Sequence, residues 1–132
     1  MKALNAIVLS IILLSVVSTN LVSADVSDET IITVDSTNLR FSPSDVTIQE
    51  GDSVRFFWSG ELLPHNAVAK DGTFDSGDPE REVDYTFIFE LGSNGTYEFV
   101  CEPHESVGMV GTITVEPAPV QNESDNQENQ SQ

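Results

Sequence analysis

The sequence contains few residues able to bind a soft metal ion. Its 132 residues include one cysteine, two histidines and two methionines, one of which is Met1. A single cysteine cannot form a disulfide within the chain. Cys101 is therefore a free thiol, part of an intermolecular disulfide, or a metal ligand.

Basic residues are also scarce. Five Lys and Arg stand against 22 Asp and Glu, which gives a net charge of −17, and every acidic residue follows residue 24. Such a charge argues against a surface for nucleic acid or anionic lipid and favours a basic or cationic partner. The acidic cluster within residues 71–84 has two interpretations, a docking patch or a solvated surface suited to salty surroundings.

The sequence also lacks helical periodicity of useful length, a glycine-rich phosphate loop, and a Ser/His/Asp set for nucleophilic catalysis. Instead it has short runs of β-branched and aromatic residues bounded by turn residues, which predict strands. These runs cover residues 31–34, 46–48, 54–58, 65–69, 85–89, 95–100 and 110–115. Seven or eight strands in about 90 residues predict an all-β fold, an antiparallel β-sandwich.

The two ends of the chain differ in composition from this central part. Residues 1–24 have a basic start, an apolar middle and a small-residue ending, which is typical of an export signal; an uncleaved membrane anchor is the alternative. Residues 117–132 contain almost nothing apolar, so they predict a disordered tail. The expected organisation is a signal peptide at 1–24, one domain at 25–116 and a tail at 117–132.

Four side chains form one candidate metal site: His65, Cys101, His104 and Met109. The last three have the spacing C-x2-H-x4-M, and His65 lies upstream in Pro-His-Asn. Two imidazoles, a thiolate and a weak axial thioether are the ligands of a mononuclear type 1, or blue, copper. Zinc also binds Cys and His, although a thioether argues against a structural zinc site. The sequence predicts one copper per chain, with Met109 axial and the other three ligands in a trigonal plane.

Side-chain alternation supports this site. Alternate residues of a strand face the same side, so Tyr97 and Phe99 share a face with Cys101, and Ile113 shares one with Met109. Both sulfur ligands therefore continue an inward-facing apolar series.

The residues around the candidate ligands have expected roles of their own. Asn66 is expected to tie the segment of His65 to the loop after Cys101 through side-chain hydrogen bonds. An apolar collar is expected around an exposed edge of His104, formed by Val107, Gly108 and either Leu62 or Leu63.

These motifs resemble those of the small blue-copper proteins of the plastocyanin, halocyanin and amicyanin group, the cupredoxins. The resemblance covers most of residues 39–115. It rests on F-x-P-x-x-V-T-I-x-x-G-D-x-V at 41–54, Pro-His-Asn at 64–66, and G-T-Y-E-F-V-C-E-P-H followed by G-M-V-G within 95–111.

The resemblance implies a Greek-key sandwich, a type 1 copper, and one-electron shuttling between membrane-bound redox complexes. Two features differ from plant plastocyanins. Val100 stands where those proteins have a tyrosine before the copper-binding cysteine, and Glu102 and Glu105 place acids beside the expected apolar docking face. The acidic charge and the expected export signal are more similar to the archaeal halocyanin-type members.

Together these features predict an extracytoplasmic one-electron carrier at the periplasmic or extracellular face of a membrane, which docks near His104. The expected partners are redox proteins, either membrane-bound electron-transfer complexes or a terminal oxidase or reductase. A monomer is expected, with no nucleic acid and no small-molecule substrate. Copper storage or delivery is the alternative, and a metal-free adhesion module is a further one. An enzyme is disfavoured because four protein ligands leave no open position for a substrate.

Overall fold

The computed structural model describes residues 27–120, so the expected signal at 1–24 and residues 121–132 of the expected tail lie outside it. Within residues 27–120, no helix is long and apolar enough to cross a membrane. The described residues form eight strands and one short 3-10 helix, η1. In chain order the elements are β1 (Glu29–Asp35), β2 (Arg40–Ser42), β3 (Asp45–Gln49), β4 (Ser53–Trp58), β5 (Val68–Ala69), β6 (Val83–Ile88), β7 (Gly95–Val100), η1 (Glu102–Val107) and β8 (Val110–Glu116).

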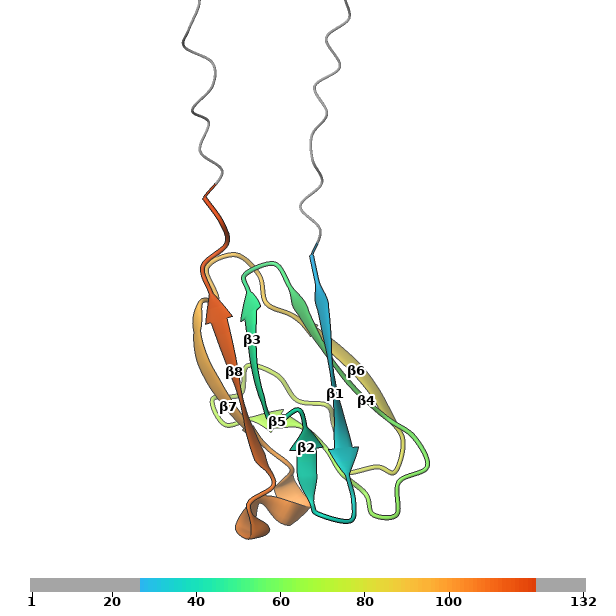
Figure 1. Ribbon diagram of the computed structural model, residues 1–132. Helices are drawn as coiled ribbons and strands as arrows, with labels where there is room; N and C mark the ends of the chain where they lie inside the picture. The colour runs from blue at the N-terminus through green and yellow to red at the C-terminus, as the bar shows by residue number, and fades with distance from the viewer. Residues whose placement is uncertain (1–26, 121–132) are drawn as a thin grey trace, which may run out of the picture.

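The strands form two four-stranded sheets, packed as a sandwich (Figure 1). The strand orders are β2-β1-β4-β6 and β3-β8-β7-β5. β1 begins and β8 ends at one pole, whereas η1 lies at the opposite pole (Figure 1). The predicted all-β sandwich is confirmed.

The expectation that every pairing is antiparallel is wrong for two of them. β1 pairs with β4, and β3 with β8, in parallel, while the other pairings are antiparallel. Between the strands of each parallel pair the chain crosses to the other sheet and returns. Such a crossing lets a strand come back beside an earlier one in the same direction, which a hairpin cannot do.

Two local predictions differ from the structure. The run at 65–69 forms a strand only at Val68–Ala69, and His65 makes an isolated bridge with Glu80 instead. The strand Arg40–Ser42 was not predicted, because three residues are too few to show alternation.

Burial alternates along the strands that form the core. Val54, Phe56 and Trp58 of β4 are buried, and Phe57 between the last two is exposed. Phe99 of β7 lies at the centre, with its ring 5.4 Å from that of Phe56 between centroids. The inward faces of the two sheets thus pack into one apolar layer that ends at the η1 pole.

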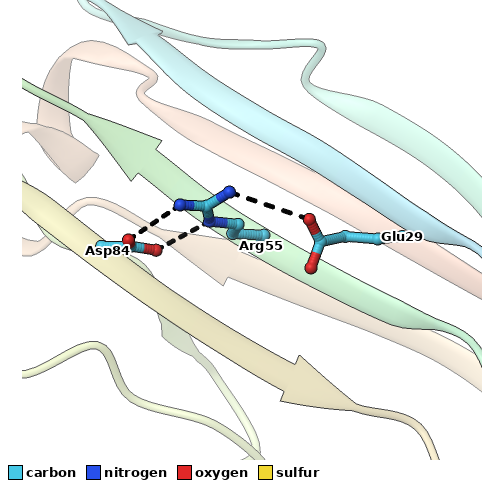
Figure 2. A network of polar contacts seen from close by, with 3 residues as sticks. All are labelled: Glu29, Arg55 and Asp84. Carbon is cyan, nitrogen blue, oxygen red and sulfur yellow. Dashed lines mark hydrogen bonds and ion pairs between the residues drawn. The ribbon is translucent and has the colours of Figure 1, made fainter.

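On the outer face of the first sheet, one ion-pair network links three strands (Figure 2). Arg55 of β4 donates two hydrogen bonds to Asp84 of β6, at 2.7 and 2.8 Å, and its Nη1 lies 3.9 Å from a carboxylate oxygen of Glu29 on β1. The hydrogen bond from Arg55 lowers the pKa of the Asp84 carboxyl. Exposed pairs contribute little to stability, so this network chiefly favours the observed register.

Candidate metal centre

His65 is fixed by backbone bonds on the loop between β4 and β5. Its N–H donates to the Glu80 carbonyl at 2.9 Å, and the Glu80 N–H donates to the His65 carbonyl at 3.0 Å. The Trp58 indole N–H also donates to the Glu80 carbonyl, at 3.1 Å, and its ring meets the imidazole edge-on. The position of this imidazole is therefore set by the sandwich itself.

The other three predicted residues lie on one compact loop. Cys101 follows β7, His104 lies in η1, and Met109 precedes β8. The Cys101 N–H donates to the Met109 carbonyl at 3.0 Å, and the Met109 N–H donates to the His104 carbonyl at 3.1 Å. Gly108 ends η1 with φ of 88°, a left-handed conformation that favours glycine. The loop can therefore turn back within eight residues and enter β8.

The side chains of His65, Cys101 and His104 converge. The Cys101 Sγ lies 3.6 Å from the His65 Nδ1 and 3.4 Å from the His104 Nδ1, and the three donor atoms all lie within 4.8 Å of one another. Thiolate and imidazole bind first-row metals such as zinc at about 2.3 and 2.0 Å, so donors in a trigonal plane lie about 3.7 Å apart. The donor separations therefore fit one shared ion.

Met109 lies in the same region of the core. Its side chain is fully buried in the apolar cluster that includes Cys101, and Ile113 and Val115 are buried on the same face of β8. This agrees with the alternation read from the sequence. A thioether buried in the same apolar cluster as the Cys101 thiol is the donor type that joins a thiolate and two imidazoles in a type 1 copper set.

Burial favours the neutral forms of His65 and Cys101, the two fully buried donors that titrate, when no metal is bound. It raises the pKa of the Cys101 thiol, although backbone hydrogen bonds from Asn66 and His104 oppose the rise. It lowers the pKa of His65, helped by the charge of His104 and opposed by that of Glu61. A metal ion that replaces the thiol proton would remove the cost of burying a bare thiolate.

Comparison with known proteins decides the family. Residues 28–116 match the family described as copper binding proteins, plastocyanin/azurin family. The chain belongs to that family. Over 126 residues it is 35% identical to the chloroplastic plastocyanin of Chlamydomonas reinhardtii, a match that covers 88% of this chain and 86% of that protein.

Other relatives match a smaller share of their length or of this chain. The chain is 33% identical over 86 residues to the chloroplastic plastocyanin of Physcomitrium patens, and this covers 58% of the chain but only 51% of that protein. Among solved structures, oxidised plastocyanin from Dryopteris crassirhizoma is similar with a TM-score of 0.55 and 28% identity. That match covers 66% of this chain and all of the other.

Asn66 ties the segment of His65 to the loop after Cys101, as predicted. Its side-chain oxygen accepts from the Glu102 N–H at 2.9 Å, and its side-chain nitrogen donates to the Glu102 carboxylate at 2.6 Å and to the Gly77 carbonyl at 2.9 Å. Asn66 is fully buried, so these bonds satisfy its amide. The residue after His65 therefore holds the residue after Cys101.

Two basic residues hold η1 from the outside, and the sequence did not reveal them. The Arg40 guanidinium donates to the Gly108 carbonyl at 2.7 Å, and the Lys70 ammonium lies 3.7 Å from a Glu105 carboxylate oxygen. Arg40 is on β2 and Lys70 follows β5. No spacing rule connects these positions with the C-x2-H-x4-M motif, so only the fold brings them together.

Proposed function

We propose that this protein is an extracytoplasmic one-electron carrier that holds a single type 1 copper ion through His65, Cys101, His104 and Met109. The observation that carries the proposal is the convergence of three soft or borderline donors within 4.8 Å, at one pole of a copper-binding family fold. Copper in such a set supplies a reversible one-electron change between Cu(II) and Cu(I).

The protein's contribution is to hold the four donors in fixed positions and to keep three of them, His65, Cys101 and Met109, away from solvent. His65 and Cys101 are fully buried, and the loop carrying the other two donors is tied to β2 through Arg40 and to the loop of His65 through Asn66. A donor set that moves little when the charge of the ion changes keeps the reorganisation energy of electron transfer small. Four protein ligands also leave no open position on the ion for a substrate, which supports a carrier and not an enzyme.

We place the docking face at the η1 pole. Large apolar side chains are exposed there on the two loops that carry the candidate ligands: Leu62 at 71%, Leu63 at 37% and Val107 at 58%. His104 is only partly buried, so its imidazole offers the short route between the ion and the surface. Exposed apolar groups rimmed by polar residues are typical of interaction sites.

The expected partners are redox proteins, either membrane-bound electron-transfer complexes or a terminal oxidase or reductase, with the carrier acting as a monomer. The strongly acidic surface favours a partner that is basic around an apolar centre. The export pattern at residues 1–24 supports a place outside the cytoplasm.

Copper loading is the experiment that tests the function. The purified protein with one equivalent of Cu(II) is expected to become intensely blue, to bleach with ascorbate, and to recover its colour on reoxidation. A colourless complex, or no complex, would contradict the proposal. Tight Cu(I) binding without redox cycling, and with rapid transfer of the ion to an acceptor, would instead support storage or delivery.

Replacing Met109 with leucine tests the axial ligand. The blue colour is expected to remain, because the thiolate is unchanged, and the reduction potential is expected to rise, because Cu(II) loses a donor. A preference of about 1.4 kcal/mol between the oxidation states corresponds to about 59 mV for one electron, and we expect a rise of that order. Voltammetry and the optical spectrum measure both. A potential and spectrum equal to those of the parent would remove Met109 from the ligand set.

A further inference from the structure

The ring nitrogen of His65 that faces away from Cys101 has a polar partner which the sequence did not indicate. The His65 Nε2 lies 2.8 Å from the Ser36 Oγ, and this hydroxyl lies 2.6 Å from the Glu61 Oε2. Ser36 follows β1, and Glu61 lies on the loop after β4. Two segments distant in sequence, the turn after β1 and the loop after β4, thus form one chain of hydrogen bonds that ends on a candidate ligand.

The direction of each bond follows from the chemistry of the groups. A carboxylate can only accept, so the single hydroxyl proton of Ser36 goes to Glu61. The Ser36 oxygen then has only lone pairs to offer His65, so Nε2 must carry the imidazole proton. In a neutral imidazole this leaves Nδ1 with its lone pair free. Nδ1 is the atom that lies 3.6 Å from the Cys101 Sγ.

We propose that Ser36 and Glu61 are positioning residues that hold His65 in the Nε2–H tautomer and lower the reduction potential of the copper centre. The effect on the reduction potential rests on the proposed function. A carboxylate two hydrogen bonds from the metal makes the imidazole a stronger donor, and a stronger donor favours Cu(II) over Cu(I).

The environment of Glu61 leaves its charge available for this role. Among residues 27–120 the ion pairs join Arg55 to Glu29 and Asp84, and Lys70 to Glu105, so Glu61 takes part in none. Its side chain is half-buried, beside an open surface hollow of about 520 Å³ that Glu80, Arg81 and Glu82 also line. Partial burial weakens the screening of its field toward His65.

The first experiment uses the copper-free protein and is independent of the proposed function. Long-range ¹H–¹⁵N correlation spectra at neutral pH are expected to show His65 with its proton on Nε2 alone. Ser36→Ala is expected to give a mixture of tautomers, and Ser36→Thr, which keeps the hydroxyl, is expected to restore the single one. A proton on Nδ1 in the parent, or an unchanged tautomer in Ser36→Ala, would overturn the assignment.

The second experiment measures the potential of the copper-loaded protein. Glu61→Gln keeps an acceptor for the Ser36 hydroxyl but removes the charge, so the potential is expected to shift upward. Glu82→Gln is the matched control, because it removes one charge from the same hollow without contacting Ser36 or His65. An upward shift in Glu61→Gln no larger than that in Glu82→Gln would overturn the proposed effect of the Glu61 charge on the potential.

The two experiments separate the two hypotheses. If the copper-free protein shows the Nε2–H tautomer and its loss in Ser36→Ala, but no blue complex forms, the proposed function fails and the tautomer assignment stands. If a blue complex forms, but Ser36→Ala keeps the tautomer of the parent and Glu61→Gln keeps its potential, the function stands and the inference fails.

Discussion

Replacing Cys101 with serine is expected to remove the blue colour of the copper-loaded protein completely. The intense absorption of a type 1 centre comes from the copper–thiolate bond, and a serine hydroxyl is too weak an acid to replace the thiolate at neutral pH. The affinity for copper is expected to fall by more than the roughly 10- to 100-fold that loss of an outer-shell partner costs. Optical titration with Cu(II) measures both effects.

The control for this prediction is the copper-free protein. Serine is close to cysteine in size, so Cys101→Ser is expected to fold and to melt as a β-sandwich, which circular dichroism can check. The other buried donors would then remain in place without the thiolate. A variant that folds and is still intensely blue would show that Cys101 does not bind the ion, and the proposed centre would be wrong.

The sequence predicted the layers of this fold better than the direction of its strands. Alternation before Cys101 and after Met109 identified the inward faces of β7 and β8, because burial on one side of a strand leaves a period of two in the sequence. The parallel pairing of β1 with β4, and of β3 with β8, left no local trace. It depends on where the chain crosses between sheets, and residues of a single strand do not encode that crossing.

The candidate site was predictable where its residues are close in sequence or chemically rare. Cys101, His104 and Met109 share one motif, and His65 is the one histidine outside it, so chemistry alone could group them. Ser36 was not predictable, since serine is common and its role depends on a contact with a residue 29 positions away. The same is true of Arg40 and Lys70, whose contacts with Gly108 and Glu105 depend on the fold and not on sequence spacing.

Replacing Gly111 with alanine is expected to destabilise the protein strongly. Gly111 lies on β8 opposite Phe99, and a Cβ built there would overlap the Phe99 ring and lie 2.5 Å from the Ser44 backbone oxygen. The ring cannot easily move, because it packs against Phe41 with centroids 4.7 Å apart and against other core rings. Overpacking of this kind costs about 3 kcal/mol. For a domain of this size, that lowers the melting temperature by more than about 10 °C.

The same substitution at Gly72 separates this steric effect from backbone strain. Gly72 has φ of 80° and open space around its Cβ position, so Gly72→Ala is expected to cost only the roughly 1–2 kcal/mol of a left-handed alanine. The double variant Phe99→Leu with Gly111→Ala is expected to recover part of the loss, because the smaller side chain makes room on β7. Thermal unfolding of the copper-free proteins measures the stability of Gly111→Ala, Gly72→Ala and the double variant. A melting temperature of Gly111→Ala at or above that of Gly72→Ala would contradict the close packing between Phe99 and β8. That packing positions the end of β7, and Cys101 follows directly after it.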